Sequence, residues 1–277
     1  MRIVDRASSG GSGLLLVCVV LTLVGCTQPA PKKPTPETAR QFLKLRGYEF
    51  NEKSFLSAAG ANDVIAVNGF LAAGMNPNAR DESSGATALI SAAWHGNDEI
   101  LNALLQGGAD VNVKDGAGYT AILRAVQNKH DEIADLLLVQ PNVDVNAHGS
   151  NGPTVLMSYV WREQESTVKK LLARGANPNL TDEDGDTALH GAAQRGNANI
   201  LRMLLDAGAN PNAKNKLGGT ALMWAGVYGR EEVARVLIER GADPALKDDD
   251  GMTASAWAAK NKREDMARLL REAEKKR

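Results

Sequence analysis

The sequence predicts an all-α solenoid built from about seven stacked helix-turn-helix repeats. Two markers predict it, because they recur in phase along the chain. One is a threonine two residues after a glycine, repeated every 33 or 34 residues, and the other is a Gly-Ala-Asn-Pro-Asn motif or a variant of it. Aromatic residues form only 4% of the 277 residues, which is too few to fill one thick core. The recurring threonines are Thr87, Thr120, Thr154, Thr187, Thr220 and Thr253.

Each repeated unit contains the residues that two short packed helices need. The threonine at the helix entrance offers its hydroxyl to the free backbone N–H groups of the first turn. Small residues such as Ala192 and Ala193 let neighbouring helices approach closely, and apolar pairs such as Leu204 and Leu205 fill the inner face of the second helix. A glycine after each helix can adopt the left-handed geometry that ends it. Because no unit can bury both of its faces alone, the units must stack and both ends must be capped.

The segment Thr187-Ala188-Leu189-His190-Gly191-Ala192-Ala193 and its counterparts resemble ankyrin repeats. The resemblance covers roughly residues 48–270 and implies a solenoid whose helix pairs are joined by β-turn or hairpin loops. It also implies a protein-binding function, exercised through the turn tips and the inner face of the first helices. The chain departs from the family pattern in having Thr-Ala where Thr-Pro is usual, and only His190 keeps the family's histidine.

The predicted domain organisation places a short leader before a single long stack. We expect a lipoprotein signal peptide at 1–25, a lipidated cysteine with a Pro-rich tether at 26–36, an N-terminal capping helix at 37–47, a degenerate first repeat at 48–80, repeats two to seven at 81–270, and a charged C-terminal tail at 271–277. The capping helix is predicted because proline starts it and Gly47 follows it.

The leader has the pattern of a secretory signal. Its apolar run at residues 14–25 follows two arginines and is too short for a bilayer, which needs about 20 residues in a helix. The run ends in Leu23-Val24-Gly25-Cys26, which resembles the lipobox of bacterial lipoproteins. The resemblance implies cleavage before Cys26, acylation of that residue and attachment to the membrane; the alternative is an ordinary cysteine at the end of a signal peptide. Because Thr27 stands where an aspartate would signal inner-membrane retention, we expect the outer membrane, facing the periplasm, in a Gram-negative cell.

The composition argues against several other classes of function. A formal net charge of -1 gives no electrostatic reason to expect nucleic acid, and two cysteines rule out a disulfide scaffold. We find no nucleophile elbow, P-loop or metal motif, so no catalytic residue, metal or cofactor is expected. The acidic residues 182–186 resemble the start of an EF-hand calcium loop. Such a loop requires a glutamate at the position that Ala193 occupies, so the resemblance does not extend further.

The expected contact surface is a stripe at the ends of the first helices. Trp, Tyr and Arg are enriched at binding hot spots, and the stripe is rich in them. Its residues are Trp94, His95, Gln127, Asn128, Trp161, Arg162, Gln194, Arg195, Tyr228 and Lys260. The alternative is that some of these rings only cover adjacent helices. Trp224 and Trp257 stand where the family has core leucine, so we expect them to be structural.

The turn tips form a second candidate surface. Its residues are Tyr119, Asn151, Glu183, Asp184, Lys216, Asp249 and Asp250, which are otherwise ordinary solvated turn residues. The sequence thus predicts a monomeric, lipid-anchored module or scaffold of the bacterial envelope that binds an unidentified protein partner. The alternatives are a periplasmic immunity or inhibitor protein that neutralises a toxic enzyme, and an accessory protein in oxidative-stress defence.

Overall fold

The computed structural model describes residues 34–150 and 152–276. Residues 35–277 form one compact unit. Three of the expectations above lie outside the described residues: the signal peptide, the lipidated Cys26 with most of its tether, and the turn-tip residue Asn151.

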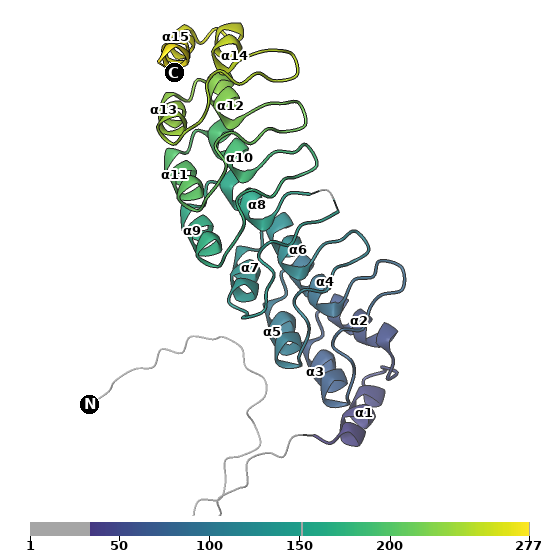
Figure 1. Ribbon diagram of the computed structural model, residues 1–277. Coiled ribbons are helices and arrows are strands. Elements are labelled where there is room, and N and C mark those ends of the chain that lie inside the picture. Colours follow the sequence, from purple (N-terminus) through teal and green to yellow (C-terminus); the bar gives the residue numbers. More distant parts are fainter. Residues whose placement is uncertain (1–33, 151, 277) are drawn as a thin grey trace, which may run out of the picture. The chain divides into compact units, whose positions relative to one another are not determined.

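Within the described residues the fold is all-helical, with fifteen helices and no strand (Figure 1). The single β-bridge recorded there pairs Arg80 with Thr87 at the base of one loop. The helices are α1 (Pro36–Leu45), α2 (Glu52–Gly60), α3 (Val64–Ala72), α4 (Ala88–His95), α5 (Asp98–Gln106), α6 (Ala121–Gln127), α7 (Asp131–Leu138), α8 (Val155–Trp161), α9 (Glu165–Ala173), α10 (Ala188–Arg195), α11 (Ala198–Asp206), α12 (Ala221–Tyr228), α13 (Glu231–Glu239), α14 (Ala254–Lys260) and α15 (Glu264–Lys275).

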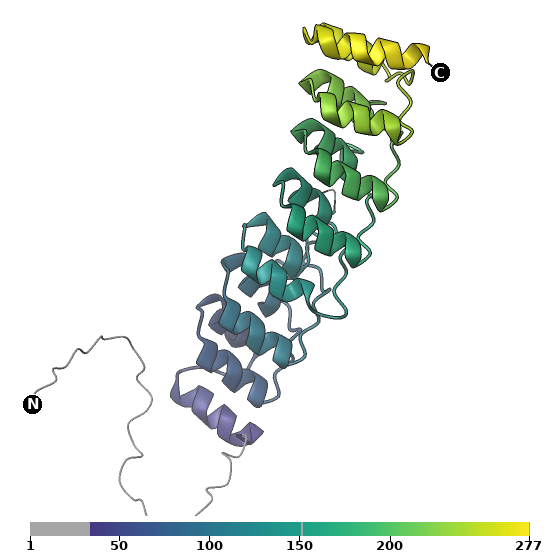
Figure 2. The same ribbon diagram turned by 90° about the vertical axis from the view of Figure 1, so that its left-hand side faces the viewer.

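The helices stand in two rows. The even-numbered helices α2 to α14, here called the inner helices, pack one on the next, and the odd-numbered helices α3 to α15, the outer helices, lie behind them (Figures 1 and 2). Helix α1 precedes the outer row and packs on α3. The loops that enter α4 to α14 all project to the same side (Figure 1). We call these loops the fingers; they are residues 80–87, 114–120, 147–154, 181–187, 214–220 and 247–253.

The threonine marker stands at the entrance of its helix in every case, but it caps as the sequence predicts at only four of its six positions, since Thr120 and Thr187 make no side-chain capping bond. The hydroxyls of Thr87, Thr154, Thr220 and Thr253 accept hydrogen bonds from backbone N–H groups three residues further on. The first repeat, which lacks the marker, uses Asn51 at the entrance of α2 instead. Each hydroxyl or amide oxygen satisfies a donor that the first helical turn leaves free, so the helices begin where the markers stand.

The core is thin and continuous along the stack. It consists mainly of alanine and leucine, and the inner-helix pair Ala192 and Ala193 is fully buried. Of the predicted apolar pair on α11, Leu204 is fully buried while Leu205 is only partly covered. The difference follows from the helical period, because adjacent residues lie about 100° apart and cannot both face the inner row.

Aromatic side chains gather at the N-terminal end, where the stack needs a lid. The rings of Tyr48, Phe50 and Phe55 surround Phe70 with centroid distances of 5.8, 6.1 and 5.7 Å. At the other end, α15 continues to Lys275, so the expected charged tail at 271–277 is helical as far as that residue. The C-terminal helix closes the core with three buried residues, Met266, Ala267 and Leu270.

The second marker has a role that the sequence analysis missed. The side-chain amide of Asn179 donates to the carbonyl oxygen of Gly208 at 2.9 Å, and its oxygen accepts from the N–H of Asn210 at 2.7 Å. Asn146 and Asn212 make the same pair of bonds to the following repeat. These asparagines form a ladder that joins successive repeats. The repeat that contains α14 and α15 has Ala245 at this position, which offers no side-chain amide.

The turns after the inner helices all require a left-handed residue. Glycine supplies it at three of them, Gly96, Gly196 and Gly229. The other four use Asn62, Lys129, Glu163 and Lys262, with φ between 55° and 63°. The expectation of a glycine after every helix is therefore wrong for these four turns. A side chain in the left-handed region costs on the order of 1 kcal/mol, which stacking in the neighbouring repeats must offset.

Candidate protein-binding surface

Four of the fingers are held rigid by a polar side chain at the base that accepts two backbone hydrogen bonds. The Oδ1 atom of Asp182 accepts hydrogen bonds from the N–H groups of Asp184 and Asp186 at 3.0 and 2.9 Å. Asp115, Asn215 and Asp248 accept the corresponding two bonds in their fingers. The acidic residues 182–186 therefore belong to the turn between repeats, which is the explanation that the sequence favoured over a calcium loop.

One finger lacks this side chain. Gly149 stands where the preceding finger has Asp115, and a Cβ atom added to Gly149 would lie 2.5 Å from Cζ of Tyr119. The ring of Tyr119 thus covers the backbone of the next finger and is only half-exposed. Tyr119 was expected at a turn tip as a free contact residue; the structure places it between two fingers because glycine leaves room for its ring.

The stripe begins with an arginine held between two rings. The guanidinium carbon of Arg124 lies 5.0 Å from the ring centroid of Trp94 and 4.2 Å from that of Tyr119. Its Nε atom donates to Asp115 at 2.8 Å, and its Nη1 atom donates to the predicted contact residue Gln127 at 3.0 Å. Trp94 remains 43% exposed, so a partner can still reach its ring. Sequence reasoning missed Arg124 because its partners lie in three different segments.

Two other predicted residues of this part have local bonds. The Nδ1 atom of His95 lies 2.9 Å from the carbonyl oxygen of Ser91 one turn earlier. The amide of Asn128 donates to the carbonyl oxygen of Arg124 at 2.9 Å. His95 is exposed, whereas Asn128 is half-buried and closes its own helix. His95 is thus the freer of the two for contact.

The centre of the stripe is partly committed to holding repeats together. Arg162 donates to Asp131 at 2.7 Å, and Gln164 and Tyr159 donate to the same carboxylate at 3.2 Å each. Burial alone would raise the pKa of Asp131, but the bonds from Gln164 and Arg162 outweigh it and lower that pKa. Burial raises the pKa of the Tyr159 phenol. Arg162 therefore acts first as a link between α7 and α8.

Trp161 lies across the gap to the next repeat. A Cβ atom added to Gly191 would lie 3.2 Å from the indole nitrogen of Trp161, so glycine in α10 makes room for this ring. The indole is still 42% exposed. Beside it, Arg195 forms a salt bridge of 2.8 Å with Glu163 of the preceding repeat. The ring therefore both covers a neighbouring helix and remains open to a partner.

The C-terminal part of the stripe contacts two tryptophans that line an apolar pocket. Gln194 donates to the hydroxyl of Tyr228 at 2.9 Å, and the Tyr228 ring stacks on Trp224 with a centroid distance of 6.1 Å. The ammonium group of Lys260 lies 4.4 Å from the ring centroid of Trp257. Two predicted contact residues, Tyr228 and Lys260, thus contact the two tryptophans that were expected to be structural, and Gln194 is linked to Trp224 through Tyr228.

The pocket itself lies between two fingers and the helices α12 and α14. It has a volume of about 220 Å³ and is lined by Asn215, Leu217, Gly219, Met223, Trp224, Val227, Asp248, Trp257 and Asn261. Trp224 and Trp257 are only half-buried there, and the indole nitrogen of Trp257 donates to Asp248 at 2.6 Å. Both rings pack against the core, in line with the structural role expected of them, and they also line the pocket. Leu217, at the finger tip, is 74% exposed.

The remaining turn-tip residues are solvent-exposed. Glu183, Asp184, Asp249 and Asp250 form no ion pair with any described residue, and the same holds for Lys216. Adjacent tips are joined through their backbones, since the N–H of Lys216 donates to the carbonyl oxygen of Asp184 at 2.9 Å. The later fingers therefore present unpaired carboxylates on a fixed frame.

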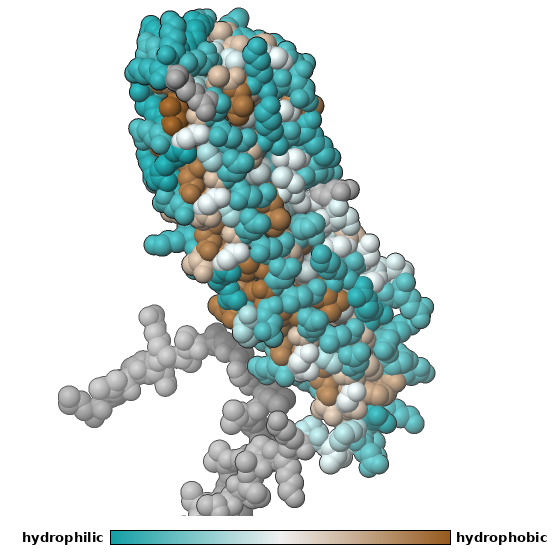
Figure 3. All heavy atoms as spheres, viewed as in Figure 1, coloured by the Kyte–Doolittle hydropathy of each residue, from teal (hydrophilic) through white to brown (hydrophobic). Residues whose placement is uncertain are grey.

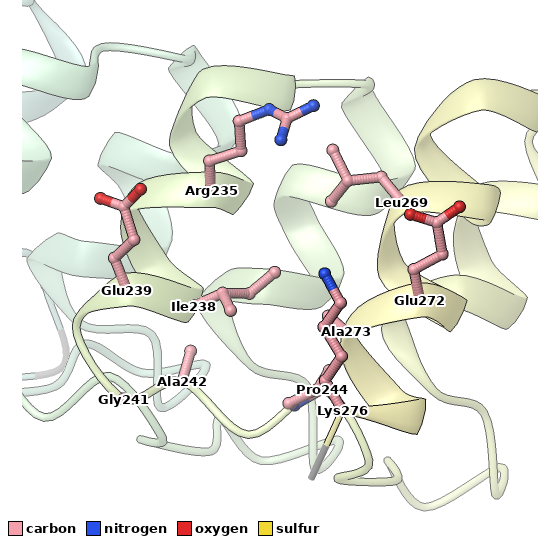
Figure 4. Close-up of a pocket in the computed structure, with 10 residues that line it drawn as sticks. All are labelled: Arg235, Ile238, Glu239, Gly241, Ala242, Pro244, Leu269, Glu272, Ala273 and Lys276. Atoms are coloured by element: carbon pink, nitrogen blue, oxygen red, sulfur yellow. The ribbon is translucent and has the colours of Figure 1, made fainter.

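A second opening lies between the outer helices α13 and α15 and has a volume of about 460 Å³ (Figure 4). Ala273 stands there at the repeat position that Arg174 and Arg240 hold earlier. Arg240 reaches Asp206 of the preceding repeat at 2.6 Å, and Arg174 reaches the carbonyl oxygen of Gln140 at 2.9 Å. Alanine leaves this space unfilled. Figure 4 shows its rim of mixed charge, formed by Arg235, Glu239, Glu272 and Lys276.

The described residues show neither a metal site nor a membrane span. In residues 34–150 and 152–276, no three His, Cys, Asp or Glu side chains gather as ligands would. No helix in the same residues is long and apolar enough to cross a bilayer. Hydrophilic residues cover most of the face seen in Figure 3, interrupted by smaller apolar patches.

His190 is buried and serves the fold. The N–H of Thr187 donates to its Nδ1 atom at 3.0 Å, which leaves Nε2 to donate to the carbonyl oxygen of Gly219 at 3.2 Å. The second bond joins α10 to the next finger. Burial lowers the pKa of His190 from its ordinary value, against the raising effect of Asp186.

Comparison with known proteins agrees with this architecture. The sequence model of the family described as ankyrin repeats (3 copies) matches residues 32–115, 55–149 and 156–248. This chain therefore belongs to the ankyrin-repeat family, whose repeats indicate a protein-protein interaction module and typically carry no enzymatic activity.

Individual relatives share the repeats over part of their length. A putative ankyrin repeat-containing protein of Treponema pallidum is 35% identical over 142 residues, which are 51% of this chain and 47% of that protein. The mitochondrial disaggregase of Bos taurus is 33% identical over 129 residues, 46% of this chain and 19% of that protein. The chain thus spans less than half of the length of either relative. The crystal structure of an ankyrin repeat domain from Acinetobacter baumannii AYE matches with a TM-score of 0.60 and 28% identity, covering 67% of this chain and 96% of that domain.

Proposed function

We propose that this chain is a lipid-anchored protein-binding module of a bacterial envelope, and that its partner binds between the inner helices and the fingers. The pocket beside Trp224 and Trp257 carries the proposal. It is apolar and open to solvent, and its two tryptophans contact two residues of the stripe, Tyr228 and Lys260. Buried aromatic anchors within a polar rim are the usual composition of a binding hot spot.

The pocket and its surroundings define the chemistry of the partner. A volume of about 220 Å³ suits one large apolar side chain. The finger that bounds the pocket carries the exposed, unpaired carboxylates of Asp249 and Asp250. Opposite charges across an interface speed association and fix its register. The partner therefore presents a large apolar residue next to lysine or arginine.

Because the fingers are rigid, they form a binding surface that is already ordered before a partner binds. The bonds from Asp182, Asn215 and Asp248 to their own turns fix the finger backbones before a partner arrives. A surface that is already ordered loses less conformational entropy on association. The Tyr119 ring between two fingers has the same effect on the earlier part of the stack.

Attachment to the envelope rests on the sequence alone. The apolar run at 14–25 followed by Cys26 supports export and acylation, and the Pro-rich segment after it supports a spacer. A Cys26→Ser variant should leave the membrane fraction, and mass spectrometry of the mature protein should show acyl chains on Cys26 in the parent only. Persistent membrane association of the variant together with an unacylated parent would contradict this part of the proposal.

We call the pocket beside Trp224 and Trp257, together with the two fingers that bound it, the groove. Its role is tested by capturing the partner from chemically crosslinked intact envelopes. Leu217→Ser removes an exposed apolar residue at the pocket, and Val139→Ser removes one of similar exposure, 68%, from an outer-helix end. We expect Leu217→Ser to lower the yield of the captured partner by roughly tenfold, the scale of one hot-spot residue, and Val139→Ser to leave it unchanged. Both variants should unfold at the parent's temperature. Equal yields from all three proteins would show that the groove is not the binding surface.

A further inference from the structure

The N-terminal end of the stack exposes apolar side chains that the protein-binding groove does not use. Leu45 at the end of α1 is 89% exposed, Ile65 at the start of α3 is 59% exposed, and Phe42 is 38% exposed. They lie in the cap, at the opposite end of the stack from the pocket beside Trp224 (Figure 1).

One contact and the helical spacing indicate that these side chains share one surface. A Cβ atom added to Gly69 would lie 3.4 Å from Cδ1 of Phe42, so the Phe42 ring rests on this part of α3. Ile65 precedes Gly69 by four residues and Leu45 follows Phe42 by three, and such spacings place residues on the same face of a helix. Phe42, Leu45 and Ile65 therefore form one patch, which we call the cap patch.

Basic residues stand beside the cap patch. The guanidinium carbon of Arg46 lies 5.7 Å from the Phe42 ring centroid, and Arg46 also pairs with Asp63 at 2.8 Å. Lys44 is exposed and forms no ion pair with any described residue. Apolar residues flanked by cations are the composition that binds an interface of anionic lipid.

The short stretch of chain between Cys26 and the cap indicates that the cap patch is covered by the membrane surface. Thr35, the residue that caps α1, stands nine positions after Cys26. A chain of that length reaches roughly 30 Å at full extension, so acylation of Cys26 would hold α1 close to the bilayer surface. This step rests on the proposed lipid attachment.

We propose that the cap patch lies on the lipid surface, with Phe42, Leu45 and Ile65 among the upper acyl chains and Lys44 beside the phosphates of anionic headgroups. The contact fixes how the stack stands on the membrane and leaves the fingers clear of it. A second, non-covalent contact also strengthens an anchor beyond what the acyl chains supply.

Vesicle titration of the unacylated protein tests the cap patch by itself. The Cys26→Ser mature chain is titrated with vesicles of phosphatidylethanolamine and phosphatidylglycerol at low ionic strength. Adding Leu45→Gln and Ile65→Gln should weaken vesicle binding by about tenfold or more, because both side chains lose their apolar contact. Val139→Gln on the same background should bind as its parent does. Vesicles of phosphatidylcholine alone should bind the parent more weakly, because they carry no net charge.

The outcomes separate the cap patch from the acyl anchor. Absence of vesicle binding by the Cys26→Ser chain, or binding unaffected by Leu45→Gln and Ile65→Gln, would overturn the inference even if mass spectrometry finds acyl chains on Cys26. Patch-dependent vesicle binding by a protein that is never acylated in cells would support the inference and contradict the anchor. If the two substitutions instead abolish capture of a protein and leave vesicle binding unchanged, the cap patch is a protein contact and the inference fails.

Discussion

Gln194 and Tyr228 stand 34 residues apart in the sequence and are joined by a hydrogen bond of 2.9 Å from the side-chain amide to the phenol oxygen. Tyr228 in turn stacks on Trp224, which lines the apolar pocket. The bond therefore fixes the rim of the pocket across two repeats. It also shows how a solenoid builds a site, with one contribution from each neighbouring unit.

The Gln194–Tyr228 bond should contribute modestly to stability. Tyr228→Phe keeps the ring stacked on Trp224 and removes only the hydroxyl, so we expect a loss of about 0.5–1 kcal/mol in the free energy of unfolding. A double-mutant cycle with Gln194→Ala in urea should recover most of that loss as coupling. Fully additive losses would mean that the bond does not form in solution.

Each asparagine of the ladder should contribute more to the free energy of unfolding than the Gln194–Tyr228 bond does. Asn179→Ala removes two bonds between successive repeats, and we expect it to lower the free energy of unfolding by about 1–2 kcal/mol. Ala245→Asn is the matched control, because the described residues after α15 include no turn that it could join, and it should change stability by less than about 0.5 kcal/mol. Urea unfolding followed by circular dichroism measures both. Equal effects would contradict the ladder as the link between repeats.

Placing glycine in a left-handed turn that lacks it should raise the free energy of unfolding. Lys129 has φ of 63° at the turn after α6 and makes no ion pair with a described residue. Lys129→Gly should raise the free energy of unfolding by about 0.5–1 kcal/mol, since relief of strain exceeds the added freedom of the unfolded chain. The reverse change, Gly229→Ala at φ of 67°, should lower it by a similar amount. A loss of stability in Lys129→Gly would refute the strain argument.

Stability should fall on mild acidification because of His190. The pKa of this imidazole is lowered in the folded chain, so the unfolded chain takes up a proton first as the pH falls below about 6.5. The free energy of unfolding should then decrease by at most about 1.4 kcal/mol per pH unit down to the folded pKa. His190→Gln keeps a hydrogen-bond acceptor and a donor but does not titrate, so the variant should lack this pH-dependent decrease in the free energy of unfolding. Identical pH profiles of parent and variant between pH 7 and pH 5 would rule it out.

Periodic features of this protein could be predicted from its sequence, and side-chain directions could not. The threonine and glycine markers located the inner helices, because capping and left-handed turns depend on residues close in sequence. Trp224 and Trp257 pack against the core as expected, but their place in the pocket could not be predicted, because a helix position alone does not say whether a half-buried ring also faces a finger. Tyr119 was expected to be free because the space that receives it is created by Gly149, 30 residues later. Contacts between repeats depend on pairs that no single repeat reveals.

The central claim is that a protein partner contacts the groove beside Trp224, and site-specific photocrosslinking tests it most directly. A benzophenone amino acid is placed at Leu217, at the pocket, and separately at Val139, which has similar exposure on the outer side. In irradiated intact envelopes, the account predicts a discrete crosslinked protein from position 217 that is absent from position 139 and is lost when Trp224→Ala is added. A crosslink that forms at position 139 and not at 217, or no crosslink at 217 at all, would contradict it.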